Sequence, residues 1–139
     1  MIKEKFNLEG KVAIITGASK GIGKAIALGF AEFGAHVVIS SRDEAAVKKV
    51  ETEFKSKGLS ASSLKCHVGN KEDRNILIET TIKTHGRIDI LVNNAGTNPY
   101  FGPIHKMPAE AYQKTMDINL NSAIELSNLV YPIMKSQNS

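Results

Sequence analysis

A glycine-rich segment near the N-terminus is the strongest candidate for ligand-binding chemistry in this sequence. Three glycines follow a short apolar run, residues 12–16, at the spacing Gly-x-x-x-Gly-x-Gly. The first can take a tight turn, the second lets the backbone approach an anion, and the third allows a following helix to pack closely. Because the first turn of a helix offers unpaired N–H groups, the pattern predicts a pyrophosphate-binding loop. The residues expected to contact the phosphates are Gly17, Ser19, Lys20, Gly21, Ile22 and Gly23.

Two alternatives to this interpretation are a purely structural turn and a P-loop for nucleoside triphosphates. A structural turn would need three flexible residues but no ligand. A P-loop would need four residues between its first glycine and a Gly-Lys pair, followed by a hydroxyl residue for Mg²⁺. Here five residues separate Gly17 from Gly23, and Ala25 has no hydroxyl group. The triphosphate interpretation is therefore excluded.

A second apolar run spans residues 35–41. If the glycine loop binds the pyrophosphate of a nicotinamide dinucleotide, the residues at the end of this run would choose between NAD and NADP. A carboxylate at this place binds the ribose hydroxyls of NAD, whereas a cation binds the 2′-phosphate of NADP. Arg42 can bind a phosphate with its planar guanidinium, Ser41 can donate a hydrogen bond, and Lys20 adds a second positive charge. Asp43 is the competing carboxylate, but its position before a helical stretch is typical of an N-cap. The sequence therefore favours NADP(H).

Strands and helices alternate along the chain, which predicts an α/β fold. The expected strands are residues 12–16, 35–41, 62–68 and 88–93, and the expected helices are 22–33, 43–57, 71–85 and a long last one from Pro108. Such alternation implies right-handed βαβ units in a Rossmann-type, doubly wound parallel sheet with strand order 3-2-1-4. We expect residues 1–139 to form a single NADP(H)-binding domain, truncated after the fourth strand and the following long helix. Functional residues should follow the strands, because ligands bind beyond their carboxyl ends.

Composition and charge exclude several other classes of protein. The 139 residues carry 18 Lys and Arg against 14 Asp and Glu, a formal net charge of +4. Several of the lysines share an expected helix with glutamates, so nucleic-acid binding is not expected. No apolar run approaches the roughly 20 residues that cross a bilayer, and the N-terminus lacks a secretory signal, so we expect no membrane contact and a cytoplasmic location. With one cysteine, Cys66, and four histidines without ligand spacing, no metal site is expected.

Residues 93–96 supply a second motif, Asn-Asn-Ala-Gly, directly after the fourth expected strand. Alone, this motif would indicate only a strand-ending turn. Together with the glycine spacing, it makes the sequence resemble the N-terminal part of the short-chain dehydrogenase/reductase family, over essentially the whole chain. The resemblance implies that Asn93 braces the central strands and that the backbone at Ala95 and Gly96 borders the cofactor. The local sequence at 66–69, 72–74 and 98–103 resembles the family's peroxisomal carbonyl (retinal) reductase branch and its bacterial relatives.

His67 departs from the pattern of this family. The family usually has an Asp after the third strand that contacts adenine, and here His67 stands in its place, followed by Val68. A histidine can hydrogen-bond the edge of the base or stack on it. A partly buried structural histidine is an equal alternative. We include His67 and Val68 among the expected cofactor contacts.

Hydride transfer to a carbonyl group needs a proton donor. The family supplies it as a Ser and a Tyr-x-x-x-Lys pair, preceded by an Asn in the long helix. Asn119 matches that Asn, and the resemblance implies that it holds a water in the proton relay; an ordinary polar helix residue is the alternative. Tyr131 and Lys135 fit the pair, but they follow only 12 residues later, on what should be the same helix. We therefore reject them as catalytic, and expect Tyr131 to pack with the helix's apolar stripe and Pro132 to kink or end the helix.

Two functional hypotheses remain open. The first is the cofactor-binding part of an NADP(H)-dependent oxidoreductase that acts on CH–OH groups, with a small-molecule carbonyl or alcohol as substrate and a homo-oligomeric complete enzyme. The second is a truncated, non-catalytic module that binds a dinucleotide or a partner chain. In either case we expect residues 1–139 alone to be inactive, since the catalytic Ser, Tyr and Lys are not among them.

Overall fold

The computed structural model describes residues 2–139, with side chains from Glu4 onward. The strands of this part are β1 (Val12–Ile15), β2 (His36–Ser41), β3 (Ala61–Lys65) and β4 (Ile90–Val92). They pair in parallel in the order β3-β2-β1-β4. The helices are α1 (Ile2–Lys5), α2 (Gly21–Glu32), α3 (Glu44–Ser56), α4 (Lys71–His85), α5 (Ala109–Met116) and α6 (Ser122–Gln137). Two short turns are η1 (Ile104–Lys106) and the π-helical η2 (Asp117–Asn121). The predicted fold class and strand order are confirmed.

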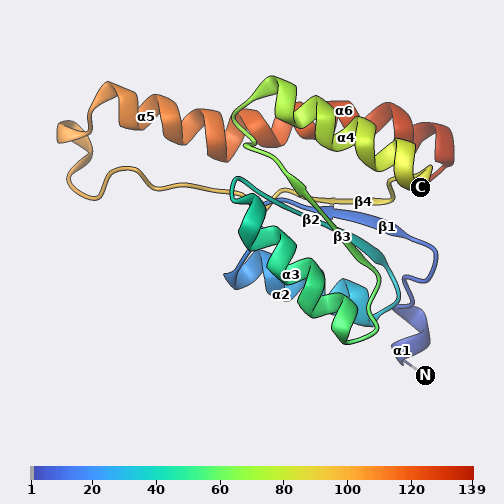
Figure 1. The fold of residues 1–139 in the computed structure, drawn as a ribbon. Coiled ribbons are helices and arrows are strands. Elements are labelled where there is room, and N and C mark those ends of the chain that lie inside the picture. The colour runs from blue at the N-terminus through green and yellow to red at the C-terminus, as the bar shows by residue number, and fades with distance from the viewer. Residues whose placement is uncertain (1) are drawn as a thin grey trace.

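The sheet lies between two layers of helices, with α2 and α3 on one face and α4 and α6 on the other (Figure 1). Successive β1 side chains alternate between the two cores. Ala13 and Ile15 pack on the side of α2 and α3, whereas Val12 and Ile14 pack on the side of α4 and α6. Because both faces are covered, the central strands consist of continuous apolar runs.

Side-chain caps fix where two of the helices begin. The Asp43 carboxylate accepts the N–H of Ala46 at 3.0 Å at the start of α3, and Asn70 accepts the N–H of Asp73 at 3.0 Å at the start of α4. Gly86 follows the end of α4, as glycine commonly does after a helix. The N-cap role predicted for Asp43 is confirmed. The bounds predicted for the helix over residues 71–85, which is α4, are confirmed as well.

The last helical segment is not one regular helix. The turn η2 interrupts it between α5 and α6, and α5 reaches beyond the sheet together with the loop that precedes it (Figure 1). Pro108 caps α5 from outside the helix instead of taking its first position. Pro132 lies inside α6, which continues to Gln137. Of the two outcomes predicted for Pro132, a kink or an end of the helix, the end is therefore wrong.

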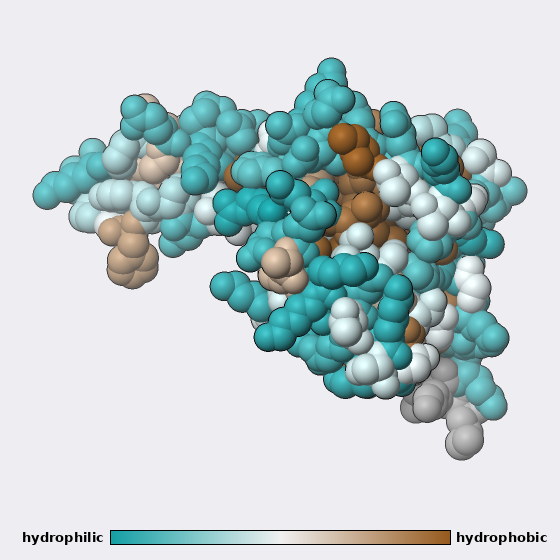
Figure 2. Space-filling view, viewed as in Figure 1, coloured by the Kyte–Doolittle hydropathy of each residue, from teal (hydrophilic) through white to brown (hydrophobic). Residues whose placement is uncertain are grey.

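The visible surface is mostly hydrophilic, with an apolar patch between α3 and α4 (Figure 2). No helix among residues 2–139 is long and apolar enough to cross a membrane.

Candidate functional site

The carboxyl ends of the strands border a cleft of about 530 Å³. Segments that follow β1, β2, β3 and β4 all contribute to it, as expected for a parallel sheet. The predicted contact residues that line the cleft are Gly17, Ser19, Lys20, Ser41, Arg42, His67, Val68, Ala95 and Gly96. Six further residues, which were not predicted as contacts, complete its wall: Asp43, Ala46, Cys66, Asn94, Thr97 and Ile118.

The first turn of α2 holds three predicted residues that lie next to the cleft without lining it. Gly21 has a φ of +58°, and a Cβ at this position would meet no atom within 4 Å. Gly23 is tightly enclosed, since a Cβ there would lie 2.5 Å from both Asn94 Nδ2 and the carbonyl oxygen of Gly17. Ile22 is 75% exposed. The open side at Gly21 and the close packing at Gly23 fit the roles that the glycine spacing predicts.

The start of α2 has the properties of an anion site. Lys20, at the N-cap, is extended and its side chain makes no capping hydrogen bond. The N–H groups of the first turn therefore receive no acceptor from the cap, and they lie where the helix dipole favours negative charge. Together with the open space at Gly21, this geometry fits the pyrophosphate of a dinucleotide.

A partly buried hydrogen-bond network joins the glycine loop to the segment after β4. Thr16 Oγ1 accepts the N–H groups of Asn94 and Ala95, at 3.1 and 3.0 Å. The Asn94 side chain donates to the carbonyl oxygens of Thr16 and Gly17, both at 3.1 Å. Asn93 instead donates to Ser127 on α6 at 3.3 Å and does not line the cleft. A bridge of the kind implied for Asn93 is thus made by Asn94, whose side chain reaches the glycine loop while that of Asn93 reaches α6.

Asn119 lies in η2 and holds the loop that follows β4. Its Oδ1 accepts the N–H of Thr97 at 2.7 Å, and its Nδ2 donates to the carbonyl oxygen of Thr97 at 2.9 Å. Thr97 itself lines the cleft, whereas Asn119 does not. The side chain therefore positions the cleft wall from behind, and the water-holding role stays a prediction.

The positive charges at the cleft are available to a ligand. Lys20 and Arg42 are exposed, and neither is among the ion pairs of the described side chains. The Asp43 carboxylate already caps α3, and its backbone contacts the Ser41 hydroxyl. Burial, followed by the charge of Asp73, raises the pKa of the Cys66 thiol to about 11, so this side chain is neutral at the cleft.

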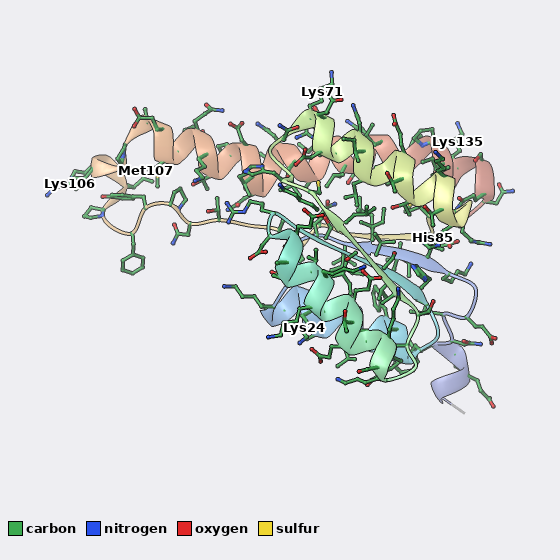
Figure 3. All side chains as sticks on the ribbon, viewed as in Figure 1. Lys24, Lys71, His85, Lys106, Met107 and Lys135 are labelled. Atoms are coloured by element: carbon green, nitrogen blue, oxygen red, sulfur yellow. The ribbon has the colours of Figure 1, made fainter. Side chains whose placement is uncertain are left out.

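Tyr131 and Lys135 lie away from this cleft. The Gln137 side chain bonds the backbone of Ile88, just before β4, at 3.1 and 2.8 Å, which places the C-terminal end of α6 at the amino edge of the sheet. Lys135 projects there near the end of α6 (Figure 3). Tyr131 is 62% exposed, so the prediction that it packs with the apolar stripe is wrong. The rejection of the pair as catalytic agrees with this geometry.

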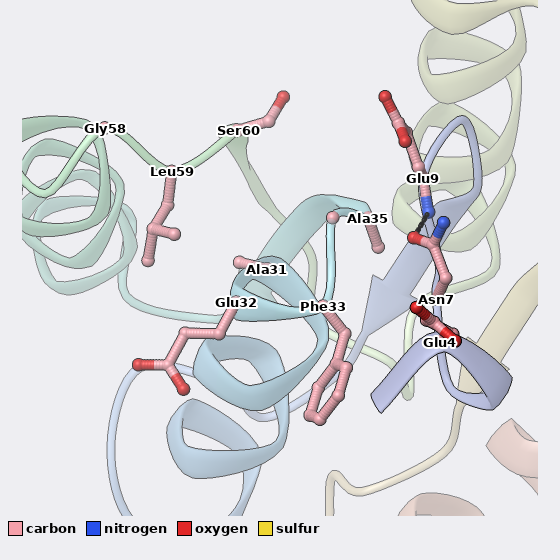
Figure 4. Close-up of a pocket in the computed structure, with 11 residues that line it drawn as sticks. Glu4, Asn7, Glu9, Ala31, Glu32, Phe33, Ala35, Gly58, Leu59 and Ser60 are labelled. Atoms are coloured by element: carbon pink, nitrogen blue, oxygen red, sulfur yellow. Dashed lines mark hydrogen bonds between the residues drawn. The ribbon is translucent and has the colours of Figure 1, made fainter. Parts of the chain in front are cut away.

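A second cavity, of about 640 Å³, lies at the amino edge of the sheet. Glu4, Asn7 and Glu9 lie on one side of it, Leu59 and Ser60 on the other, and the end of α2 lies between them (Figure 4). None of the predicted site residues lines this cavity. Across the described part of the chain, no group of three or more His, Cys, Asp and Glu side chains could hold a metal ion.

A parallel α/β sheet with a glycine loop and an anion site at its carboxyl edge defines a Rossmann-type nucleotide-binding protein. Residues 11–139 match the family model described as short chain dehydrogenase. The chain belongs to the short-chain dehydrogenase/reductase family, as its motifs indicated.

Known proteins of this family are similar to the chain in sequence and in structure. The human protein named Dehydrogenase/reductase SDR family member 4 is 44% identical over 130 residues, which cover 94% of this chain and 47% of that protein. The hydroxysteroid dehydrogenase from Escherichia coli superimposes with a TM-score of 0.92 at 37% identity, over 97% of this chain and 57% of the other. A metagenomic short-chain oxidoreductase, crystallised with NADP, gives a TM-score of 0.89 at 35% identity, over 94% and 59%. The chain spans about half the length of the curated relatives that it matches.

Proposed function

We propose that this chain is the cofactor-binding domain of an NADP(H)-dependent oxidoreductase that transfers hydride between nicotinamide and a carbonyl or alcohol group. The observation that carries the proposal is one cleft that unites the glycine loop, the free cations of Lys20 and Arg42, and the backbone of Ala95 and Gly96. The NADP complex of a structural neighbour supports the choice of cofactor. A small-molecule substrate, a cytoplasmic location and a homo-oligomeric complete enzyme belong to the same proposal.

Each part of the cleft has a task in binding this cofactor. The first turn of α2 accepts the pyrophosphate, and the open side of Gly21 lets the phosphates approach the backbone. The nicotinamide supplies or accepts the hydride when it is bound. Thr16 and Asn94 hold the Ala95 backbone against the glycine loop, and Asn119 fixes Thr97 beside it. The cleft is thus held by hydrogen bonds before any ligand arrives, which lowers the entropy cost of binding.

The preference for NADP over NAD rests on which charges are free. Asp43 is the one carboxylate among the lining residues, and the start of α3 uses its oxygen. Arg42 and Lys20 make no ion pair within the described side chains. A free guanidinium and a free ammonium favour a 2′-phosphate over a ribose diol.

Cofactor titration of Arg42→Ala in the intact protein tests the proposal. Loss of a charge-assisted contact should weaken NADP binding by about 10- to 150-fold and leave NAD binding nearly unchanged. Lys20→Ala should act in the same direction but less strongly, because a solvated ammonium is held less rigidly. Lys106→Ala is the control, since Lys106 lies at the far tip beside α5 (Figure 3). All titrations use one salt concentration. Equal losses for NAD and NADP in Arg42→Ala would contradict the assignment.

The non-catalytic alternative is favoured by one observation. Within residues 4–139, the one Tyr-x-x-x-Lys pair, Tyr131 and Lys135, lies on α6 toward the edge of the sheet opposite the cleft. If the intact protein has no other Tyr-x-x-x-Lys pair, it would bind the dinucleotide without catalysing hydride transfer. Reductase assays of the intact protein with NADPH separate the two functions.

A further inference from the structure

The strand β3 forms one edge of the sheet, and one side of its backbone is unpaired. Among the described residues it pairs with β2 alone. The Ser60 carbonyl oxygen accepts an N–H of β2 at 3.1 Å, and the Cys66 N–H donates to a carbonyl oxygen of β2 at 2.9 Å. Because alternate residues of a strand turn their backbone groups to the same side, those of Ser63 and Lys65 face away from β2. Within residues 4–139 neither makes a further backbone hydrogen bond, so this edge can accept an added strand.

A groove of about 800 Å³, which we call the edge groove, borders this strand. Ser63, Leu64 and Lys65 of β3 line it together with residues between Arg42 and Lys48 at the start of α3. Free backbone groups and a lined space thus lie together. This is the arrangement in which the edge of a sheet binds an extended peptide.

The side chains of the edge groove are mainly positive. Arg42, Lys48 and Lys65 line it. Arg42 and Lys65 are exposed and make no ion pair within the described side chains, whereas Lys48 pairs with a glutamate of its own helix. The groove has two carboxylates, and that of Asp43 already caps α3, which leaves Glu44. This balance of charge favours an acidic partner.

The two faces of β3 differ in character. The Ser63 hydroxyl donates to Glu51 on α3, so the side chain of Lys65, two residues further on, lies on the same face. Leu64 lies on the opposite face, where it packs on the core beneath α4 together with Ile82. Figure 2 shows apolar surface between α3 and α4. A strand added to β3 would therefore meet cations on one face and apolar side chains on the other.

We propose that β3 and the edge groove bind an extended segment of a partner protein in which acidic and apolar residues alternate. The side chains of an added strand alternate between its two faces, so the acidic ones meet the cations on the α3 side and the apolar ones cover the side of Leu64. A second copy of this chain does not fit this edge. Pairing of two β3 strands would bring Arg42 and Lys65 against the same cations, and lysine at an edge discourages such pairing.

Docking at this edge also opposes the binding of NADP, and this consequence rests on the proposed function. Arg42 lines both the edge groove and the cofactor cleft. An acidic side chain and a 2′-phosphate therefore compete for one guanidinium. The docked segment should weaken NADP binding and spare NAD, and NADP should weaken docking by the same factor.

Titrations of the intact protein with a labelled peptide test the docking. The probe is about six residues long, with glutamate and valine in alternation. We expect it to bind about tenfold more tightly than a peptide with the same residues in two blocks. Lys65→Glu should weaken its binding by about fivefold or more and leave NADP binding nearly unchanged, since Lys65 does not line the cleft. Lys106→Glu, with the same change of charge at the far tip beside α5, is the matched control (Figure 3).

A second measurement leaves the protein unchanged. N-methyl groups on either the glutamates or the valines of the peptide remove one alternate set of its N–H donors. One set should be essential and the other dispensable, because only one set faces β3. No binding of the alternating peptide, equal binding of the block peptide, or equal effects of the two methylations would overturn the proposal. If Arg42→Ala spared NADP binding while docking still depended on Lys65, the NADP assignment would fail and the docking would stand.

Discussion

Thr16 joins two motifs through a single hydroxyl group. Its Oγ1 accepts two N–H groups that lie 78 and 79 residues further along the chain, and donates to the Val92 carbonyl oxygen at 3.3 Å. Thr16 is 1% exposed, so water cannot replace these bonds. The hydroxyl therefore fixes the distance between the glycine loop and the segment after β4, both of which line the cleft.

Replacing Thr16 by Val should remove these bonds while keeping the shape of the side chain. Two buried N–H groups would lose their acceptor, and we expect the free energy of unfolding to fall by about 1–3 kcal/mol, with weaker dinucleotide binding. Urea denaturation and cofactor titration measure the two effects. Thr16→Ser, which keeps the Oγ, is the matched control. A Val variant as stable as the wild type would show that the network contributes nothing.

Chain order alone brings several of the predicted contact residues to the cleft. Arg42 and Lys20 line the same cleft because the carboxyl ends of adjacent parallel strands share one edge of the sheet. The sequence assigned the brace to the wrong asparagine, because a run of two at the end of a strand does not reveal which one faces the glycine loop. Thr16 was missed as well, since its hydroxyl acts through backbone groups that carry no sequence signal.

Tyr131→Phe gives a residue-level test of the pair that fits the catalytic spacing by chance. Tyr131 is exposed, and the Lys135 ammonium lies over its ring, 5.9 Å from the ring centroid. Turnover of the intact enzyme should therefore be nearly unchanged by loss of the hydroxyl. Steady-state kinetics with NADPH measure this. A loss of about a hundredfold, the scale for removing an acid catalyst, would make Tyr131 a proton donor after all.

At the scale of elements, capped helices were predicted better than the ends of strands. The bounds of α4 follow from Asn70 and Gly86, which act locally. The third strand ends at Lys65 and not at the expected residue 68, because strand bounds depend on pairing with a neighbour. No sequence pattern predicted the π-helical turn η2, since one extra residue in a helical turn barely changes the spacing of the apolar residues. It lies where Asn119 meets Thr97, and such turns often accompany functional sites.

Two histidines link the end of α4 to the sheet. The rings of His36 and His85 pack against each other at a tilt of 38°, with their centroids 4.0 Å apart. The two ring nitrogens of His36 also contact the hydroxyls of Ser60 and Ser62, at 2.7 and 2.9 Å. Burial, and then the charges of His85 and Lys55, lower the pKa of His36 from 6.5 to about 4, against the opposing charge of Glu51. Burial also lowers the pKa of His85.

These contacts predict that stability falls in mild acid. Below about pH 6.5 the unfolded chain takes up protons that the folded chain refuses, so the free energy of unfolding should fall as the pH drops from 6.5 toward 4. The stability that Glu51 contributes, with its pKa lowered from 4.5 to about 2, is lost as the pH falls from about 4.5 toward 2, below the range of the measurement. Urea midpoints between pH 7 and 4.5 measure the effect. His36→Gln should flatten the slope, whereas exposed His105→Gln should not. Equal slopes in His36→Gln and wild type would contradict the assignment.

On the scale of the whole molecule, the cleft and the Tyr131–Lys135 pair lie toward opposite edges of the sheet. The cleft and its free cations lie at the carboxyl edge of the strands, whereas the end of α6 that carries Lys135 is bonded to the amino edge. Residues 4–139 therefore hold groups that can bind and orient a dinucleotide, but place no tyrosine and lysine together at the cleft. When residues 1–139 are studied alone, we therefore expect cofactor binding to be kept and turnover to be lost.

We accordingly predict that residues 1–139, expressed alone, bind NADPH but reduce no carbonyl compound. We expect the pyrophosphate and 2′-phosphate contacts to come from the glycine loop, the first turn of α2 and Arg42, which lie at or beside the cleft. Protonation of a developing alkoxide needs an acid near the nicotinamide, and its absence typically costs about 10²- to 10⁴-fold in rate. Cofactor titration and NADPH oxidation with a panel of aldehydes and ketones measure the two properties on one preparation, and Arg42→Ala confirms that the binding is specific. Turnover by the isolated chain would mean that a proton donor within these 139 residues, or water, replaces the tyrosine.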